Sequence, residues 1–82
     1  MAEETTDILT AVAEITAKEA GVEASAINRG SRFADDLDID SPGLLTIATE
    51  VEERFGVVLD DSAIPTLPTV GALADLVAGQ KG

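Results

Sequence analysis

The side chains that could do chemistry in this sequence are carboxylates and hydroxyls, and they gather before one serine. Residues 33–41 read Phe-Ala-Asp-Asp-Leu-Asp-Ile-Asp-Ser, so that four aspartates precede Ser41. The 82 residues include no Cys and no His, which excludes a thiolate zinc site, a cysteine nucleophile and a histidine-based triad. Because Ser41 has no histidine base available, we expect no catalytic residue in this chain and assign any chemistry at this hydroxyl to another enzyme.

Calcium binding is the first interpretation of the acidic stretch. Asp36, Asp38 and Asp40 occupy positions one, three and five of an EF-hand count. The count then fails, because the sixth position, which needs Gly, is Ser41 and the twelfth, which needs Glu, is Ile47. We therefore expect no dedicated metal site, only adventitious cation binding by the carboxylates.

Helix capping and covalent attachment are the other two interpretations, and both centre on Ser41. Ser41 is a strong N-cap candidate for a helix in which Pro42 fits the first position. A serine there also exposes a hydroxyl where the helix dipole and free N–H groups favour an attached phosphate. Its oxygen would still accept a capping bond after esterification. The residues alone favour capping and leave attachment open.

Helical periodicity predicts the elements before the serine. A first helix is expected from about Thr6 to Ala20, with Thr5 or Thr6 as its N-cap. Gly21 and Val22 then resemble a left-handed C-cap with its hydrophobic clasp. A long connection follows, and its apolar residues are expected to pin it across the helices: Ile27, Phe33, Leu37 and Ile39.

A second helix is expected from Ser41 to Gly56, where Gly56 provides the C-cap. Glu50 and Arg54 are spaced to form an ion pair along it. One stripe of the helix is expected to face the core, namely Leu44, Ile47, Ala48, Val51 and Phe55.

The remaining residues predict a brief third helix and a last one. The brief helix holds Ile64 and ends around Pro65 and Pro68, and Thr69 caps the last helix. The apolar face of the last helix is expected to consist of Val70, Leu73, Ala74 and Val77. The predicted fold is all-α: a small four-helix bundle with a long loop between the first two helices and a short third helix. It forms a single domain over residues 1–82, ordered from about 6 to 78.

Charge and composition limit the partners. The formal net charge is −11, which makes nucleic-acid binding through phosphate neutralisation unfavourable. No apolar run is long enough to span a bilayer, and the acidic start, residues 1–4, lacks the basic character of a secretory signal. We expect a cytoplasmic monomer that binds neither nucleic acid nor membrane.

Three blocks of sequence resemble the acyl carrier proteins. Residues 33–41 resemble the segment that leads into the Asp-Ser attachment motif of that family. Residues 52–59, with Glu52, Phe55-Gly56-Val57 and Leu59, resemble the end of its second helix and the following turn. Residues 69–73, Thr-Val-Gly-Ala-Leu, resemble the start of its last helix. The blocks occur in order and at the usual spacing, and the resemblance covers about residues 6–78.

The resemblance implies a carrier and not an enzyme. A phosphopantetheinyl transferase would move 4′-phosphopantetheine from coenzyme A to Ser41, beside the motif residue Asp40. The thiol of that arm would carry acyl groups as thioesters between enzymes of fatty-acid or polyketide biosynthesis. The growing chain would tuck between the helices, against Leu44, Ile47, Val51, Phe55, Ile64 and Leu67.

Departures from the family pattern concern partner recognition. The family usually has Leu after the serine and acidic residues nearby, whereas this chain has Pro42, Gly43 and Thr46. The expected partners are ketosynthases, acyltransferases and other enzymes with basic docking surfaces. The contacts expected for them are Leu45, Glu52, Glu53, Asp36 and Asp38. The alternative is an unmodified acidic module that keeps the fold and binds a basic protein.

Overall fold

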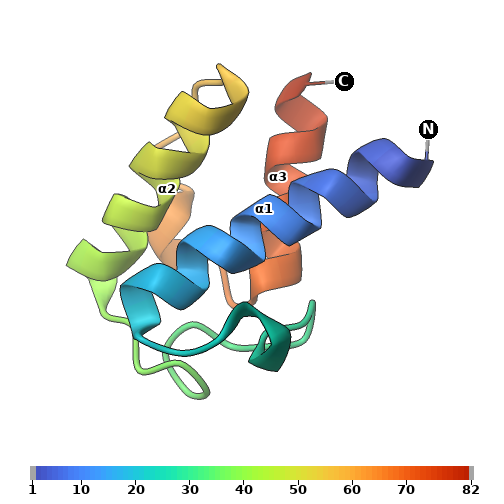
Figure 1. Ribbon diagram of the computed structural model, residues 1–82. Coiled ribbons are helices and arrows are strands. Elements are labelled where there is room, and N and C mark those ends of the chain that lie inside the picture. Colours follow the sequence, from blue (N-terminus) through green and yellow to red (C-terminus); the bar gives the residue numbers. More distant parts are fainter. Residues whose placement is uncertain (1, 82) are drawn as a thin grey trace.

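Three α-helices form the molecule: α1 (Ala2–Ala20), α2 (Ser41–Phe55) and α3 (Val70–Lys81). The computed structural model describes the backbone of residues 2–81 and the side chains of residues 7–80. Helix α1 crosses both other helices and packs against each of them (Figure 1). No strand forms within residues 2–81, so the predicted all-α class is confirmed.

The core consists of aliphatic side chains supplied by all three helices. Each helix contributes side chains with no exposed surface: Val12 from α1, Ile47 and Val51 from α2, and Leu73 and Val77 from α3. Burying a side chain of this size stabilises the fold by about 1.5–3 kcal/mol, so the helices are held mainly by these contacts. The predicted face of α3 is confirmed in full, and Phe55 is the one member of the α2 stripe that is only half-buried.

Helix α1 begins earlier than predicted and ends where predicted. Its first residue is Ala2, so Thr5 and Thr6 lie inside the helix and do not cap it. The physical reason is that Ala and Glu at residues 2–4 are good helix formers, and acidic residues suit a helix start. Gly21 adopts φ 75° as expected for a C-cap, whereas Val22, predicted to form a hydrophobic clasp, is 42% exposed and lies outside the hydrophobic core.

The predicted short third helix is not confirmed. In its place Ile64–Thr66 forms one 3-10 turn. Pro65 and Pro68 have no backbone N–H to donate, which prevents an α-helix from propagating through this segment. Before the turn, Asp60 Oδ1 accepts hydrogen bonds from the hydroxyl and the backbone N–H of Ser62, which lower the pKa of that carboxyl.

The long connection between α1 and α2 is pinned to the start of α3. A second 3-10 turn, Ala24–Ala26, opens it, and Ile27, Phe33 and Ile39 are buried as predicted while Leu37 is half-buried. Three backbone hydrogen bonds join it to the residues around Thr69: Val70 N–H to Ser31 O at 3.0 Å, Phe33 N–H to Pro68 O at 3.3 Å, and Gly71 N–H to Arg29 O at 3.0 Å. These bonds hold the loop against the start of α3.

Candidate functional site

Ser41 is the first residue of α2, and its side chain lies on the surface. Among the described residues its hydroxyl makes no hydrogen bond. Two of the other three serine hydroxyls are engaged, since Ser31 Oγ accepts from the Asn28 N–H and Ser62 Oγ donates to Asp60, whereas Ser25 is exposed like Ser41. Ser41 therefore offers an accessible oxygen that can be esterified without breaking an internal contact.

The N-cap of α2 is Asp40, and the prediction that Ser41 caps this helix is wrong. Asp40 has extended backbone, and its Oδ1 accepts the Gly43 N–H at 3.0 Å. Its carbonyl oxygen accepts the Leu44 N–H at 2.9 Å. Asp and Ser are about equally good caps. The sequence predicted Pro42 as the first residue of the helix, but the helix begins one residue earlier, at Ser41. The cap of α2 is thus Asp40, and the adjacent Ser41 hydroxyl takes no part in capping.

Gly43 is required by close packing at the start of α2. A Cβ at this position would lie 3.1 Å from both Asp40 Oδ1 and Ile39 Cγ2, and 3.5 Å from Glu19 Oε2. The two distances of 3.1 Å are shorter than Cβ contacts normally are, whereas the distance to Glu19 is an ordinary contact. The departure from an acidic residue here therefore lets the loop before Ser41 and the end of α1 pack closely against α2.

A hollow of about 530 Å³ opens beside Ser41. Its walls come from the start of α2, from the long connection and from the segment before α3. Leu44 and Leu67 of the predicted acyl pocket line it, whereas Ile47, Val51 and Ile64 are fully buried beneath and do not reach it. The full lining is Arg32, Phe33, Ala34, Asp35, Ile39, Asp40, Ser41, Leu44, Pro65, Leu67, Pro68 and Thr69.

The expected partner contacts differ in how free they are. Leu45 is 40% exposed and Glu53 is exposed. Glu52 is half-buried, and its Oε2 accepts the Leu59 N–H at 2.7 Å. Asp36 Oδ2 accepts the Arg32 N–H at 2.9 Å. Glu52 and Asp36 therefore hold turns of the chain.

Asp38 completes the expected set of contacts. It is exposed and has φ 55°, the only positive value among the described residues other than glycine. A short polar side chain tolerates this left-handed conformation better than most, which explains an aspartate at this bend.

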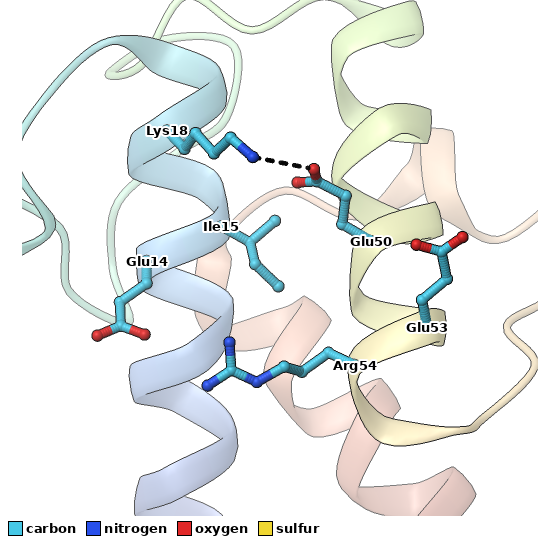
Figure 2. A pocket seen from close by; sticks show the side chains of 6 residues that line it. All are labelled: Glu14, Ile15, Lys18, Glu50, Glu53 and Arg54. Carbon is cyan, nitrogen blue, oxygen red and sulfur yellow. Dashed lines mark ion pairs between the residues drawn. The ribbon is translucent and has the colours of Figure 1, made fainter.

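A second hollow, of about 460 Å³, lies between α1 and the later half of α2 (Figure 2). Glu50 was expected to pair with Arg54, but it pairs with Lys18 of α1, with 3.5 Å between Nζ and Oε1. The interaction between helices replaces the predicted one within α2. Figure 2 shows that the charged side chains around it carry both signs, and they are Glu14, Lys18, Glu50, Glu53 and Arg54.

The described residues form no metal cluster and no membrane-spanning helix. Within the described residues no three acidic side chains gather so that they could hold a metal ion. No helix in that part of the chain combines the length and the apolar character needed to cross a membrane.

The sequence of this chain is similar to a known protein family and to several of its members. Residues 10–77 match the family described as phosphopantetheine attachment site. The chain is 38% identical to the acyl carrier protein of Beutenbergia cavernae over 99% of both chains. It is 37% identical to that of Myxococcus xanthus, over 89% of this chain and 92% of the relative. The chain belongs to the acyl carrier protein family.

The fold agrees with this assignment. The solved acyl carrier protein from Enterococcus faecalis superposes with a TM-score of 0.77 and 28% identity, over 93% of this chain and 96% of that one. As an acyl carrier protein, the chain carries 4′-phosphopantetheine for other enzymes and is itself no catalyst. The exposed Ser41 hydroxyl beside an open hollow fits such a group, because esterification there displaces no internal hydrogen bond.

Several residues that line the hollow were not predicted as site residues, and Arg32 is the basic one among them. No motif singled it out, because only the folded loop brings residue 32 to the same hollow as Ser41.

Proposed function

We propose that Ser41 is the attachment point of 4′-phosphopantetheine and that the loaded protein carries acyl groups as thioesters between enzymes of fatty-acid or polyketide biosynthesis. The observation that supports this most directly is the free, exposed hydroxyl of Ser41 at the edge of a hollow. The whole chain would act as a single carrier domain, with the family motif residue Asp40 as the helix cap beside the attachment site.

Loading needs only a nucleophilic oxygen from this chain. A phosphopantetheinyl transferase would supply the base that takes the Ser41 proton. Ser41 Oγ would then bond to the phosphorus that carries the pantetheine, and adenosine 3′,5′-bisphosphate would leave coenzyme A. Because Asp40 holds the Gly43 N–H, the first turn of α2 would keep its cap throughout. The positive end of the α2 dipole would favour the phosphate that remains.

The acyl chain would be sheltered beside and beneath the hollow. Leu44 and Leu67 already line it, and they would be the first apolar contacts. A longer chain would have to part these two and displace the fully buried Ile47, Val51 and Ile64. Phe55 lies toward the other end of α2, where it would contact only the longest chains. Small aliphatic side chains rearrange at lower cost than rings, which suits a pocket that opens on demand.

The partner enzymes would include the transferase, ketosynthases and acyltransferases, docking through basic surfaces. We place the main charged contact at Glu53, because Glu52 is engaged with Leu59. Leu45 would supply an apolar contact, and Asp36 and Asp38 would add negative potential on the loop side. Such charges act mostly on the association rate. High negative charge also favours a monomer, and we propose the cytoplasm as the compartment shared with coenzyme A and these enzymes.

Intact-mass spectrometry tests the attachment. The protein is incubated with coenzyme A and several transferases, including one from the same source. The expected result is the added mass of one phosphopantetheine, lost in Ser41→Ala and kept in Ser25→Ala, which removes an exposed hydroxyl elsewhere.

An unmodified protein under all these conditions would contradict the proposal. It would favour the alternative function, an acidic module that keeps the carrier fold and binds a basic protein. Loading that persists in Ser41→Ala would move the attachment to another residue.

A further inference from the structure

We infer that Arg32 binds the phosphodiester of the arm attached at Ser41. The inference rests on the attachment proposed above and adds a residue to that site. Arg32 and Ser41 line the same hollow, one from the long connection and the other from the start of α2. Among the described side chains, Arg32 is the only basic one that lines the hollow.

The backbone of Arg32 is held in place on three sides. Its N–H donates to Asp36 Oδ2 at 2.9 Å, and it forms an isolated antiparallel bridge with Thr69. The neighbouring residues, Ser31 and Phe33, bond to the backbone around the start of α3. The side chain thus projects from a fixed base, which lowers the entropy that ordering it on a ligand would cost.

The guanidinium has donors to spare. Its Nη1 lies 3.1 Å from Asp35 Oδ2, and the side chain is 64% exposed. An arginine carries five N–H donors in a planar fork, so this one contact leaves several free for phosphate oxygens. A pair this exposed is also weak, so Asp35 competes only modestly with a phosphodiester.

The charges around the hollow make such a cation useful. Asp35 and Asp40 both line it, and the whole chain has a net charge of −11. A phosphodiester adds one more negative charge to these walls. The Gly43 N–H already donates to Asp40 Oδ1, and Pro42 has no N–H. The start of α2 therefore has few free donors for the phosphate. Arg32 supplies the donors that the helix start lacks.

Phosphorus-31 NMR on the loaded protein tests the contact directly. Loading is first verified by intact mass for the natural protein, Arg32→Ala, Asp35→Asn and Arg29→Ala. Arg29 is the matched control, because it pairs with Asp75 at 2.8 Å and does not line the hollow. The side-chain Nε–H resonance of Arg32 is also compared before and after loading.

The expected result is a phosphodiester resonance that moves by more than its linewidth in Arg32→Ala and stays in place in Arg29→Ala. Asp35→Asn should leave the phosphorus contact intact, whereas a purely structural role of the Arg32–Asp35 pair would make both variants alike. Loading should shift the Arg32 Nε–H resonance. An unchanged phosphorus resonance in loaded Arg32→Ala, or identical effects of Arg32→Ala and Asp35→Asn, would overturn the inference while leaving attachment at Ser41 standing. Failure to load the natural protein would instead overturn both.

Discussion

Glu52 and Glu53 are neighbours in sequence with different surroundings. Glu52 is half-buried, and its carboxylate accepts the Leu59 N–H at 2.7 Å, which ties the end of α2 to the turn that follows. Glu53 points outward at the rim of the hollow between α1 and α2 (Figure 2). A change of charge at Glu52 should therefore lower the stability of the fold, whereas the same change at Glu53 should affect only the charge of the surface.

Replacing Glu52 should destabilise the protein. Glu52→Ala removes a hydrogen bond to a charged group, and we expect a loss of roughly 1–2 kcal/mol in the free energy of unfolding. Glu52→Gln keeps an acceptor and should lose less, while Glu53→Ala should stay within about 0.5 kcal/mol of the natural protein. Urea unfolding followed by circular dichroism measures all three. Equal stabilities for Glu52→Ala and Glu53→Ala would show that the contact to Leu59 contributes nothing.

Residue types singled out Ser41 and Asp40 through the Asp-Ser motif, and attachment at Ser41 stays a proposal. The cap of α2 was assigned to Ser41 but is Asp40, because both residue types cap about equally well and only the backbone angles separate them. Arg32 was missed because its role depends on a wall that forms between segments distant in sequence.

At the scale of elements, the start of α2 separates two roles that a single serine was expected to combine. Asp40 accepts the N–H of Gly43, and the Ser41 hydroxyl makes no hydrogen bond to any residue that the structure describes. The helix can therefore hold its shape whether or not the serine is modified.

Two single substitutions should show this separation. Asp40→Ala removes the cap and should cost about 0.5–2 kcal/mol of stability. Ser41→Ala leaves the cap in place and should be nearly neutral toward unfolding. Thermal and urea unfolding of the unloaded proteins compare the two. A larger loss for Ser41→Ala than for Asp40→Ala would return the capping role to the serine.

The sequence predicted best those helix ends that have a capping residue, such as a C-terminal glycine or an N-terminal threonine. Gly56, with φ 65°, ends α2, and Thr69 caps α3 through the Ala72 N–H at 3.2 Å. The start of α1 was placed too late because a threonine suggested a cap where the preceding acidic residues continue the helix. The short third helix was over-predicted because its apolar residue, Ile64, packs into the core equally well from a 3-10 turn.

At the scale of the whole molecule, the main feature is the excess of acidic over basic side chains. The chain carries 16 acidic and 5 basic side chains. The three ion pairs among the described side chains are all at least partly exposed, and such pairs contribute little. Self-repulsion of the remaining carboxylates therefore opposes the compact state.

Salt and divalent cations should raise the melting temperature. Added NaCl screens repulsion between exposed carboxylates, and Mg²⁺ should act at lower concentration because of its higher charge. Differential scanning calorimetry at increasing concentrations of each salt measures the effect. A melting temperature that stays flat across the magnesium titration would show that repulsion does not limit stability.

The bonds that join the long connection to the start of α3 also bear on the order of folding. Ser31 bonds to Val70 and Phe33 bonds to Pro68, so each pairing joins residues that lie far apart in the sequence. Closing such a long stretch of chain costs conformational entropy before the contact stabilises the fold. Contacts of this kind tend to form late, after the helices have begun to associate. We expect the wall facing Ser41 to be among the last parts of the molecule to assemble, so that a modifying enzyme which reads that wall acts only on chains that have finished folding.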